Sequence, residues 1–212
     1  MNRIFNLLLQ KIYYLLYHSF AWTYDWVAAV VSCGRWQDWL KATLPYLPGP
    51  KVLELGHGPG HLQAALYKKR ISIVGIDASK SMCRLAKGNL LRQGVRPVLV
   101  NGYAQCVGLR SGYFDQVVAT FPSDYIFHPL TLAEARRVLK PNGKLIVLLG
   151  AWNTGRNLCQ RLTGWLMRNP GVHALDTSQR YLEPFINAGF STKIELIDQM
   201  DSRLVIIRAD RC

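Results

Sequence analysis

From residue 51 onward, short apolar runs alternate with segments whose apolar positions recur at helical spacing. The runs predict strands at 51–55, 71–76, 96–100, 115–119 and 144–149. The segments between them predict helices at 62–69, 79–93 and 131–139, with Ser79 as an N-cap, Gly94 as a terminator and a stop at 141–143. Short strands that alternate with helices are typical of a parallel sheet covered by helices on both faces.

The chain changes character near its end. A helix is expected at 179–188, closed by Gly189, followed by strands at 192–196 and 203–208 with a turn between them. We therefore expect the otherwise parallel sheet to finish in an antiparallel hairpin.

A cluster of helix breakers, Pro45, Pro48, Gly49 and Pro50, separates a mainly helical lead segment from the alternating region. The expected organisation is a helical cap at 1–50 and a ligand-binding domain at 51–212. Residues 151–177, which contain tryptophans and arginines, are expected to form an insertion on the acceptor side of the domain.

The first 20 residues predict an amphipathic helix with a broad apolar face. Two interpretations remain open: a cap that lines the acceptor pocket, or an interfacial helix on a membrane. Charged residues interrupt every long apolar stretch, so no membrane-spanning helix is expected. No cleavage site follows the first apolar run, so no secretory signal is expected either.

The net charge of +13 is concentrated in the middle of the chain, where residues 51–150 carry 14 basic and 5 acidic side chains. Within 68–96, eight cations accompany one acid, Asp77. This basic region is either a solvated face or a surface that attracts an anionic membrane. The five cysteines form no CxxC pair, which favours a cytoplasmic protein with neither a disulfide framework nor a metal site. Any association with a membrane would be peripheral, at its inner face.

Three alternate glycines, Gly56, Gly58 and Gly60, follow the first strand. Without Cβ atoms they let the backbone approach a ligand in the crevice at the carboxyl ends of the strands. The next strand ends at Asp77, and a carboxylate there can accept hydrogen bonds from both hydroxyls of a ribose. Together these features predict a nucleotide-like ligand.

Glu54 helps to decide which ligand this is. A carboxylate beside a dinucleotide's pyrophosphate would be repulsive, and the third glycine comes one residue earlier than in the G-x-G-x-x-G of NAD sites. Beside the amino group and sulfonium of S-adenosylmethionine the same carboxylate would gain roughly 4 kcal/mol at about 4 Å.

At this point the chain resembles the class I S-adenosylmethionine-dependent methyltransferases. The similarity is strong over residues 50–150 and fainter over 178–208; it rests on 54–60, 74–86, 114–120 and 134–145. It implies a Rossmann-like seven-stranded α/β sheet that is mostly parallel, with an antiparallel last strand and helices on both faces. The product of the cofactor would be S-adenosylhomocysteine.

The resemblance also implies a cofactor site. Glu54 and the three glycines would surround the methionine part, Asp77 the ribose, and Ala78 and Met82 the adenine, with Thr120 at the end of the fourth strand. The family's usual acid after the third strand is missing from Tyr103-Ala104-Gln105. Tyr103 could stack on the adenine instead, or Gln105 could accept its hydrogen bond.

The loop at 120–125 is where this family faces its acceptor, and Asp124, Tyr125 and His128 are the candidate proton acceptors or orienting groups. The loop lacks the double-proline tetrapeptide of nucleic-acid amino-methyltransferases, which argues against a nucleic-acid acceptor. Residues 20–26 and 34–36 loosely resemble the corresponding parts of the ubiquinone and menaquinone methyltransferases. This resemblance implies that Tyr24 would lie over the cofactor.

The sequence therefore favours methyl transfer to a small, hydrophobic or lipid-like acceptor. An NAD-binding oxidoreductase and a non-catalytic cofactor-binding module are the alternatives. Glu54 and the early third glycine speak against the first, whereas the missing loop acid keeps the second open.

Overall fold

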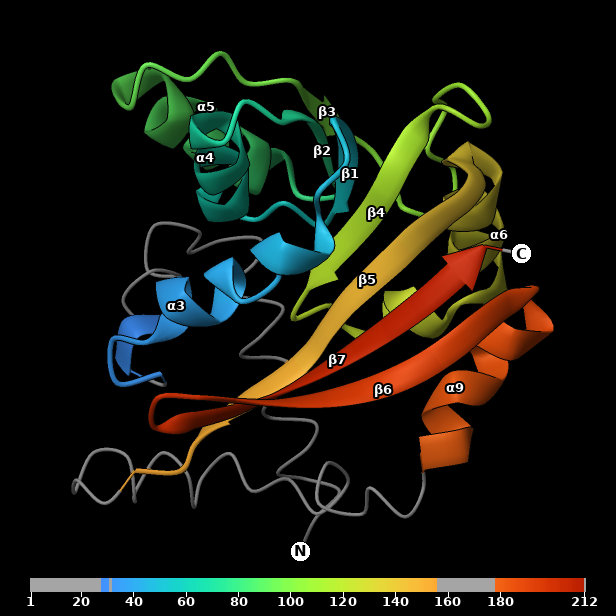
Figure 1. Ribbon diagram of the computed structural model, residues 1–212. Helices are drawn as coiled ribbons and strands as arrows, with labels where there is room; N and C mark the ends of the chain where they lie inside the picture. The colour runs from blue at the N-terminus through green and yellow to red at the C-terminus, as the bar shows by residue number, and fades with distance from the viewer. Residues whose placement is uncertain (1–27, 31, 156–177, 212) are drawn as a thin grey trace, which may run out of the picture.

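The computed structural model describes residues 28–155, except residue 31, and residues 178–211. Within these ranges seven strands form one sheet (Figure 1). The strands are β1 (Lys51–Leu55), β2 (Ser72–Asp77), β3 (Leu99–Asn101), β4 (Phe114–Thr120), β5 (Leu139–Asn153), β6 (Phe190–Gln199) and β7 (Ser202–Arg211). The helical elements are α3 (Trp36–Lys41), η2 (Leu44–Tyr46), α4 (His61–Lys68), α5 (Lys80–Arg92), η3 (Asp124–Phe127), α6 (Pro129–Val138) and α9 (Ser178–Asn187).

The strand order is β3-β2-β1-β4-β5-β7-β6, and the strands are parallel except β7, which runs antiparallel to β5 and β6. The predicted Rossmann-like sheet with an antiparallel last strand is confirmed. The order reverses between β1 and β4, and open α/β sheets bind ligands in the crevice at such a point.

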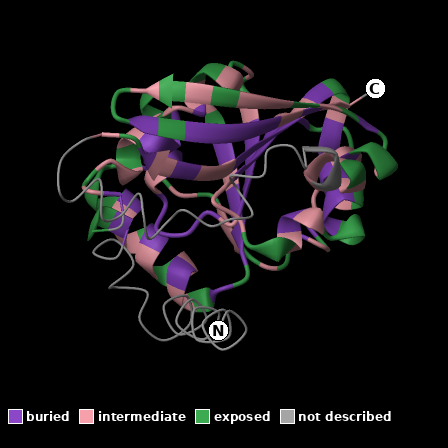
Figure 2. Cartoon of the chain, turned by 90° about the horizontal axis from the view of Figure 1, so that it is seen from below, coloured by how far each residue is buried: buried purple, intermediate pink, exposed green. Residues whose placement is uncertain are grey.

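Alternation along each strand divides the sheet's side chains between two helical layers (Figure 1). On one face Leu53 and Val117 pack with the inner sides of α6 and α9. On the other face Val52 and Val118 pack with α3 and α4. The burial pattern in Figure 2 follows this division, because the central strands are buried while the helices expose their outer sides.

Several predicted boundaries need correction. β5 begins at Leu139, directly after α6, because Leu139 pairs with Phe114 and Lys144 with Gln116, so the predicted stop at 141–143 is a bulge inside the strand. β5 continues to Asn153, so residues 151–153 belong to the sheet rather than to the predicted insertion. β6 and β7 are each ten residues long, longer than predicted, because they pair along their whole length.

The cysteine spacing predicts no disulfide framework, but Cys33 is disulfide-bonded. Its partner lies outside the described residues. Cys83 and Cys106 are free thiols.

Candidate cofactor site

The loop between β1 and α4 has a backbone that only glycine adopts readily. Gly56, Gly58 and Gly60 have φ angles of 73°, 50° and 88°. A Cβ atom on Gly56 would lie 2.6 Å from the Tyr125 hydroxyl, whereas a Cβ on Gly58 would meet no atom within 4 Å. The loop is therefore closed by Tyr125 at Gly56 and open for a close approach at Gly58.

Asp77 lies at the end of β2 with its carboxylate aimed at this loop. One oxygen accepts from the Gly58 N–H at 2.9 Å and the other from the Ser79 N–H at 2.8 Å. Ser79 in turn is the N-cap of α5, as predicted, and accepts from the Met82 N–H. Each oxygen keeps a further lone pair, so a fixed carboxylate beside an open glycine loop fits the two hydroxyls of a ribose.

Glu54 is buried rather than exposed at the loop. It lies on the same face of β1 as Val52, has 1% of its surface exposed, and accepts a hydrogen bond from Gln63 Nε2 of α4 at 2.8 Å. Burial raises its pKa to about 8, against the opposing effect of the Gln63 hydrogen bond. A nearby cation would favour the ionised form; direct contact between Glu54 and the cofactor stays a prediction.

The predicted adenine residues fall into two groups. Ala78 is exposed, whereas Met82 is completely buried on the inner side of α5. After β3, Tyr103 is 68% exposed, Ala104 is buried and Gln105 is half-buried. An exposed ring at Tyr103 is available for stacking.

Asn101 joins these groups, and sequence reasoning missed it. It lies beside Asp77 in the β2–β3 register and donates from Nδ2 to the carbonyls of Asp77 and Ala78, at 2.9 and 3.1 Å. Its position at the end of β3, next to the end of β2, is the feature that could have identified Asn101 from the sequence.

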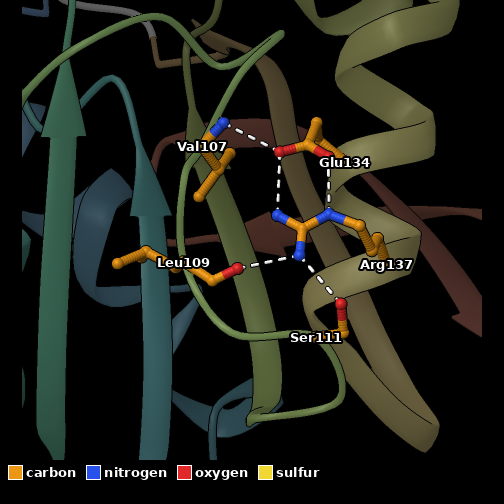
Figure 3. A network of polar contacts seen from close by, with 5 residues as sticks. All are labelled: Val107, Leu109, Ser111, Glu134 and Arg137. Atoms are coloured by element: carbon orange, nitrogen blue, oxygen red, sulfur yellow. Dashed lines mark hydrogen bonds and ion pairs between the residues drawn. The ribbon is translucent and has the colours of Figure 1, made fainter.

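A clamp ties the loop after β3 to α6 (Figure 3). Arg137 Nε donates to Glu134 at 2.6 Å, and its Nη1 donates to the Leu109 carbonyl at 2.8 Å and to Ser111 Oγ at 2.9 Å. Glu134 also accepts from the Val107 N–H at 2.8 Å. The guanidinium hydrogen bond lowers the pKa of Glu134, and the clamp holds the loop that carries Tyr103.

His57 occupies a buried position inside the glycine loop, another residue that the sequence did not single out. Its Nδ1 donates to the Gly58 carbonyl at 2.8 Å, which leaves Nε2 to accept from the Cys83 thiol at 3.4 Å. Burial lowers the pKa of His57, although Asp77 opposes the shift, and burial also raises the pKa of Cys83. The pair is therefore a neutral support beneath the loop.

On the acceptor side, the structure treats the three candidate residues differently. The Tyr125 hydroxyl donates to the Leu55 carbonyl at 2.9 Å and so lies directly over the glycine loop. Asp124 is exposed on η3. His128 is exposed and its Nδ1 accepts from the Leu130 N–H, which makes it the N-cap of α6. Of the three, Tyr125 has the contact with the cofactor loop.

Thr120, half-buried at the end of β4, precedes an aromatic contact that the sequence did not predict. Phe121 has a positive φ of 49° and stacks on Trp36 of α3, with ring centroids 4.3 Å apart. This contact brings the lead segment to the carboxyl ends of the strands. Tyr24 and most of the proposed insertion, residues 156–177, lie outside the described residues.

Residues 53–147 match the family model described as "Methyltransferase domain". The ubiquinone/menaquinone biosynthesis C-methyltransferase UbiE of Paraburkholderia xenovorans (strain LB400) is 34% identical over 140 residues, which are 63% of this chain and 58% of the relative. The corresponding protein of Cupriavidus metallidurans is 33% identical over 141 residues, with the same shares. The chain thus matches somewhat over half the length of these curated relatives.

Solved structures share the fold. Geranyl diphosphate C-methyltransferase from Streptomyces coelicolor aligns with a TM-score of 0.60 and 11% identity over 82% of this chain and 78% of its own. A SAM-dependent methyltransferase from Methanosarcina mazei gives a TM-score of 0.57 and 16% identity over 79% and 96% of the two chains.

The fold and the glycine loop, with the Asp77 carboxylate beside it, are those expected of a class I S-adenosylmethionine-binding domain. The family match over residues 53–147 and the similar relatives support a class I S-adenosylmethionine-dependent methyltransferase. Among them it is similar to UbiE. The family cofactor is S-adenosylmethionine, as the sequence predicted.

Proposed function

We propose that the protein transfers a methyl group from S-adenosylmethionine to a small, hydrophobic acceptor. The observation that supports this proposal most directly is the Asp77 carboxylate, fixed by the Gly58 N–H beside an open stretch of the glycine loop. The bound cofactor would supply a methyl group on a positively charged sulfur. The acceptor's electron pair forms the new bond to carbon, the carbon–sulfur bond breaks, and the sulfur leaves neutral.

The protein's own part is to position the two reactants and to exclude water. Tyr125 closes the loop from above Gly56, and its hydroxyl is already held by the Leu55 carbonyl. Where the accepting atom carries a proton, Asp124 or His128 would take it, since both are exposed close to Tyr125 along the chain.

The name of the UbiE relatives, ubiquinone/menaquinone biosynthesis C-methyltransferases, suggests an acceptor of the quinol type. Aromatic rings at the strand ends support this suggestion, because Trp36 and Phe121 offer flat apolar surfaces to a ring-shaped molecule. We accordingly propose a quinol-like or similarly lipid-like acceptor.

An acceptor of this kind would place the protein at the inner face of a membrane, with residues 1–20 and the basic region 68–96 as the proposed contacts. None of the described helices is long and apolar enough to cross a bilayer. Peripheral association therefore rests on the charge pattern.

Calorimetry with S-adenosylhomocysteine and with NAD tests the cofactor, and turnover screened against quinols, simple phenols and phospholipids tests the acceptor. We expect binding of S-adenosylhomocysteine, none of NAD, and product formation with a quinol. Binding without product for any acceptor would favour the non-catalytic module instead, and failure to bind S-adenosylhomocysteine would refute the proposal.

A further inference from the structure

A groove of about 650 Å³ runs along the outer side of α4, away from the sheet. One wall is formed by α3 and η2, and the other by the last residues of α5. Its floor includes His61, Ala65 and Lys68, which share one side of α4 because they are spaced at helical intervals. A volume of this size is typical of small-ligand sites.

The charge around the groove has one sign. Lys41 comes from α3, Lys68 and Lys69 from the end of α4, and Arg92 from the end of α5, while no carboxylate is among the lining residues. Lys41 lies 4.0 Å from Asp38. Within the described ranges, no carboxylate pairs with Lys68, Lys69 or Arg92.

Stabilisation of the helices explains only part of this arrangement. Lys68, Lys69 and Arg92 lie at the carboxyl-terminal ends of α4 and α5, where helix dipoles favour cations. That argument does not require three separate elements to direct their cations into one hollow. An anion bound between them would offset their mutual repulsion.

The remaining walls are partly apolar. Leu40 and Leu44 from one side and Ala64 and Ala65 from the other line the groove, and no Phe, Tyr or Trp does. A bound molecule would thus need an apolar portion beside its charge. The absence of lining Phe, Tyr and Trp rings argues against single-stranded nucleic acid, whose bases usually stack on such rings.

The groove adjoins the glycine loop, since the lining residue Asn89 donates to the Pro59 carbonyl at 3.1 Å, but none of its lining residues contacts the Asp77 carboxylate. We propose that it binds a phosphate group carried by a small, partly apolar molecule. The phosphate would lie between Lys41, Lys68 and Lys69, and the apolar portion along Leu40 and Leu44. Such a group belongs either to a soluble organic phosphate or to a phospholipid headgroup. The proposal does not depend on methyl transfer.

A charge-matched pair of variants tests the groove. In the first, Lys41, Lys68 and Lys69 are all replaced by Gln. In the second, Gln replaces Arg110, Lys193 and Arg203, which are exposed and lie outside both the groove and the basic region 68–96. Both lose three positive charges. Binding of S-adenosylhomocysteine by each variant shows that it has folded.

The probes are glycerol 3-phosphate, followed by calorimetry, and phosphatidylglycerol vesicles, followed by sedimentation at 0.15 M salt. For whichever of the two probes the groove binds, we expect the affinity of the first variant to fall roughly 100-fold, at about fivefold per lysine. The affinity of the second variant should change less than about fivefold. Loss confined to glycerol 3-phosphate or to vesicles identifies the source, and either supports the groove. Equal losses in both variants, or binding of neither probe by the unaltered protein, would overturn the proposal.

Discussion

Replacement of Glu54 by Gln is expected to stabilise the protein without ligand, in a way that depends on pH. The folded protein holds a proton on Glu54 until its pKa of about 8, whereas the unfolded chain releases that proton near the ordinary value of 4.5. Stability from this group is therefore complete below pH 4.5 and is lost as the pH rises toward 8. The amide introduced by Glu54→Gln would keep a hydrogen bond with Gln63 and would not titrate.

The size of the effect follows from the shift. Each pH unit between the two pKa values changes the free energy of unfolding by about 1.4 kcal/mol, so the original protein loses about 3 kcal/mol between pH 5 and pH 7. For a chain of this length, 3 kcal/mol corresponds to roughly 6 to 12 °C in Tm. We expect E54Q and the original protein to melt at similar temperatures at pH 5 and to differ by that amount at pH 7.

Differential scanning calorimetry across pH 5 to 8 measures this difference directly. The matched control is Glu183→Gln, an identical change at an exposed position on α9. A gap between E54Q and the original protein that stays constant from pH 5 to 7 would refute the reasoning, because it would mean that Glu54 titrates alike in the folded and unfolded states.

Three further substitutions probe the site. Asp77→Asn should weaken S-adenosylhomocysteine binding about 10- to 100-fold in calorimetry, since an amide cannot accept from both the Gly58 and Ser79 N–H groups, and unchanged affinity would remove Asp77 from the site. Gly58→Ala should cost about 1 to 2 kcal/mol of stability and abolish cofactor binding, because Gly58 has a positive φ. The control Gly88→Ala, inside α5 with open space around it, should stabilise the protein by about 0.5 to 1 kcal/mol and leave binding intact. Equal effects of the two substitutions would contradict the role of the loop. Arg137→Gln should lower the free energy of unfolding by about 1 to 3 kcal/mol and speed hydrogen exchange in residues 102–112. Arg110→Gln, at an exposed position in the same loop, should do neither. Unchanged exchange in the Arg137 variant would refute the role of the clamp.

Local signals explain what the sequence could predict. β1 has the predicted bounds, and α5 begins after the predicted cap Ser79, because a continuous apolar run and a hydroxyl before a helix each act within a few residues. β6 was predicted too short for the opposite reason. Its last residues, Asp198 and Gln199, are polar and fall in the predicted turn, and only the pairing with β7 shows that they belong to the strand.

The side chains around the cofactor loop show the same limit. Alternation from Val52 places Glu54 on the face that packs against α4, so its burial was within reach of the sequence. The identity of its partner was not, since Gln63 faces it only after α4 packs on the sheet. His57 and Cys83 likewise meet across the β1–α4 loop and α5.

The two halves of the site are built in different ways. Gly58, Asp77 and Asn101 come from the ends of adjacent parallel strands, so short motifs specify them, and the matched residues 53–147 contain all three. The acceptor side instead joins Trp36, which lies outside the matched stretch, to Phe121 after β4. Such a contact depends on how the lead segment packs, which no short motif specifies. The proposed donor site therefore lies within the residues that match the methyltransferase family, whereas the proposed acceptor side includes a contact with Trp36, outside that stretch.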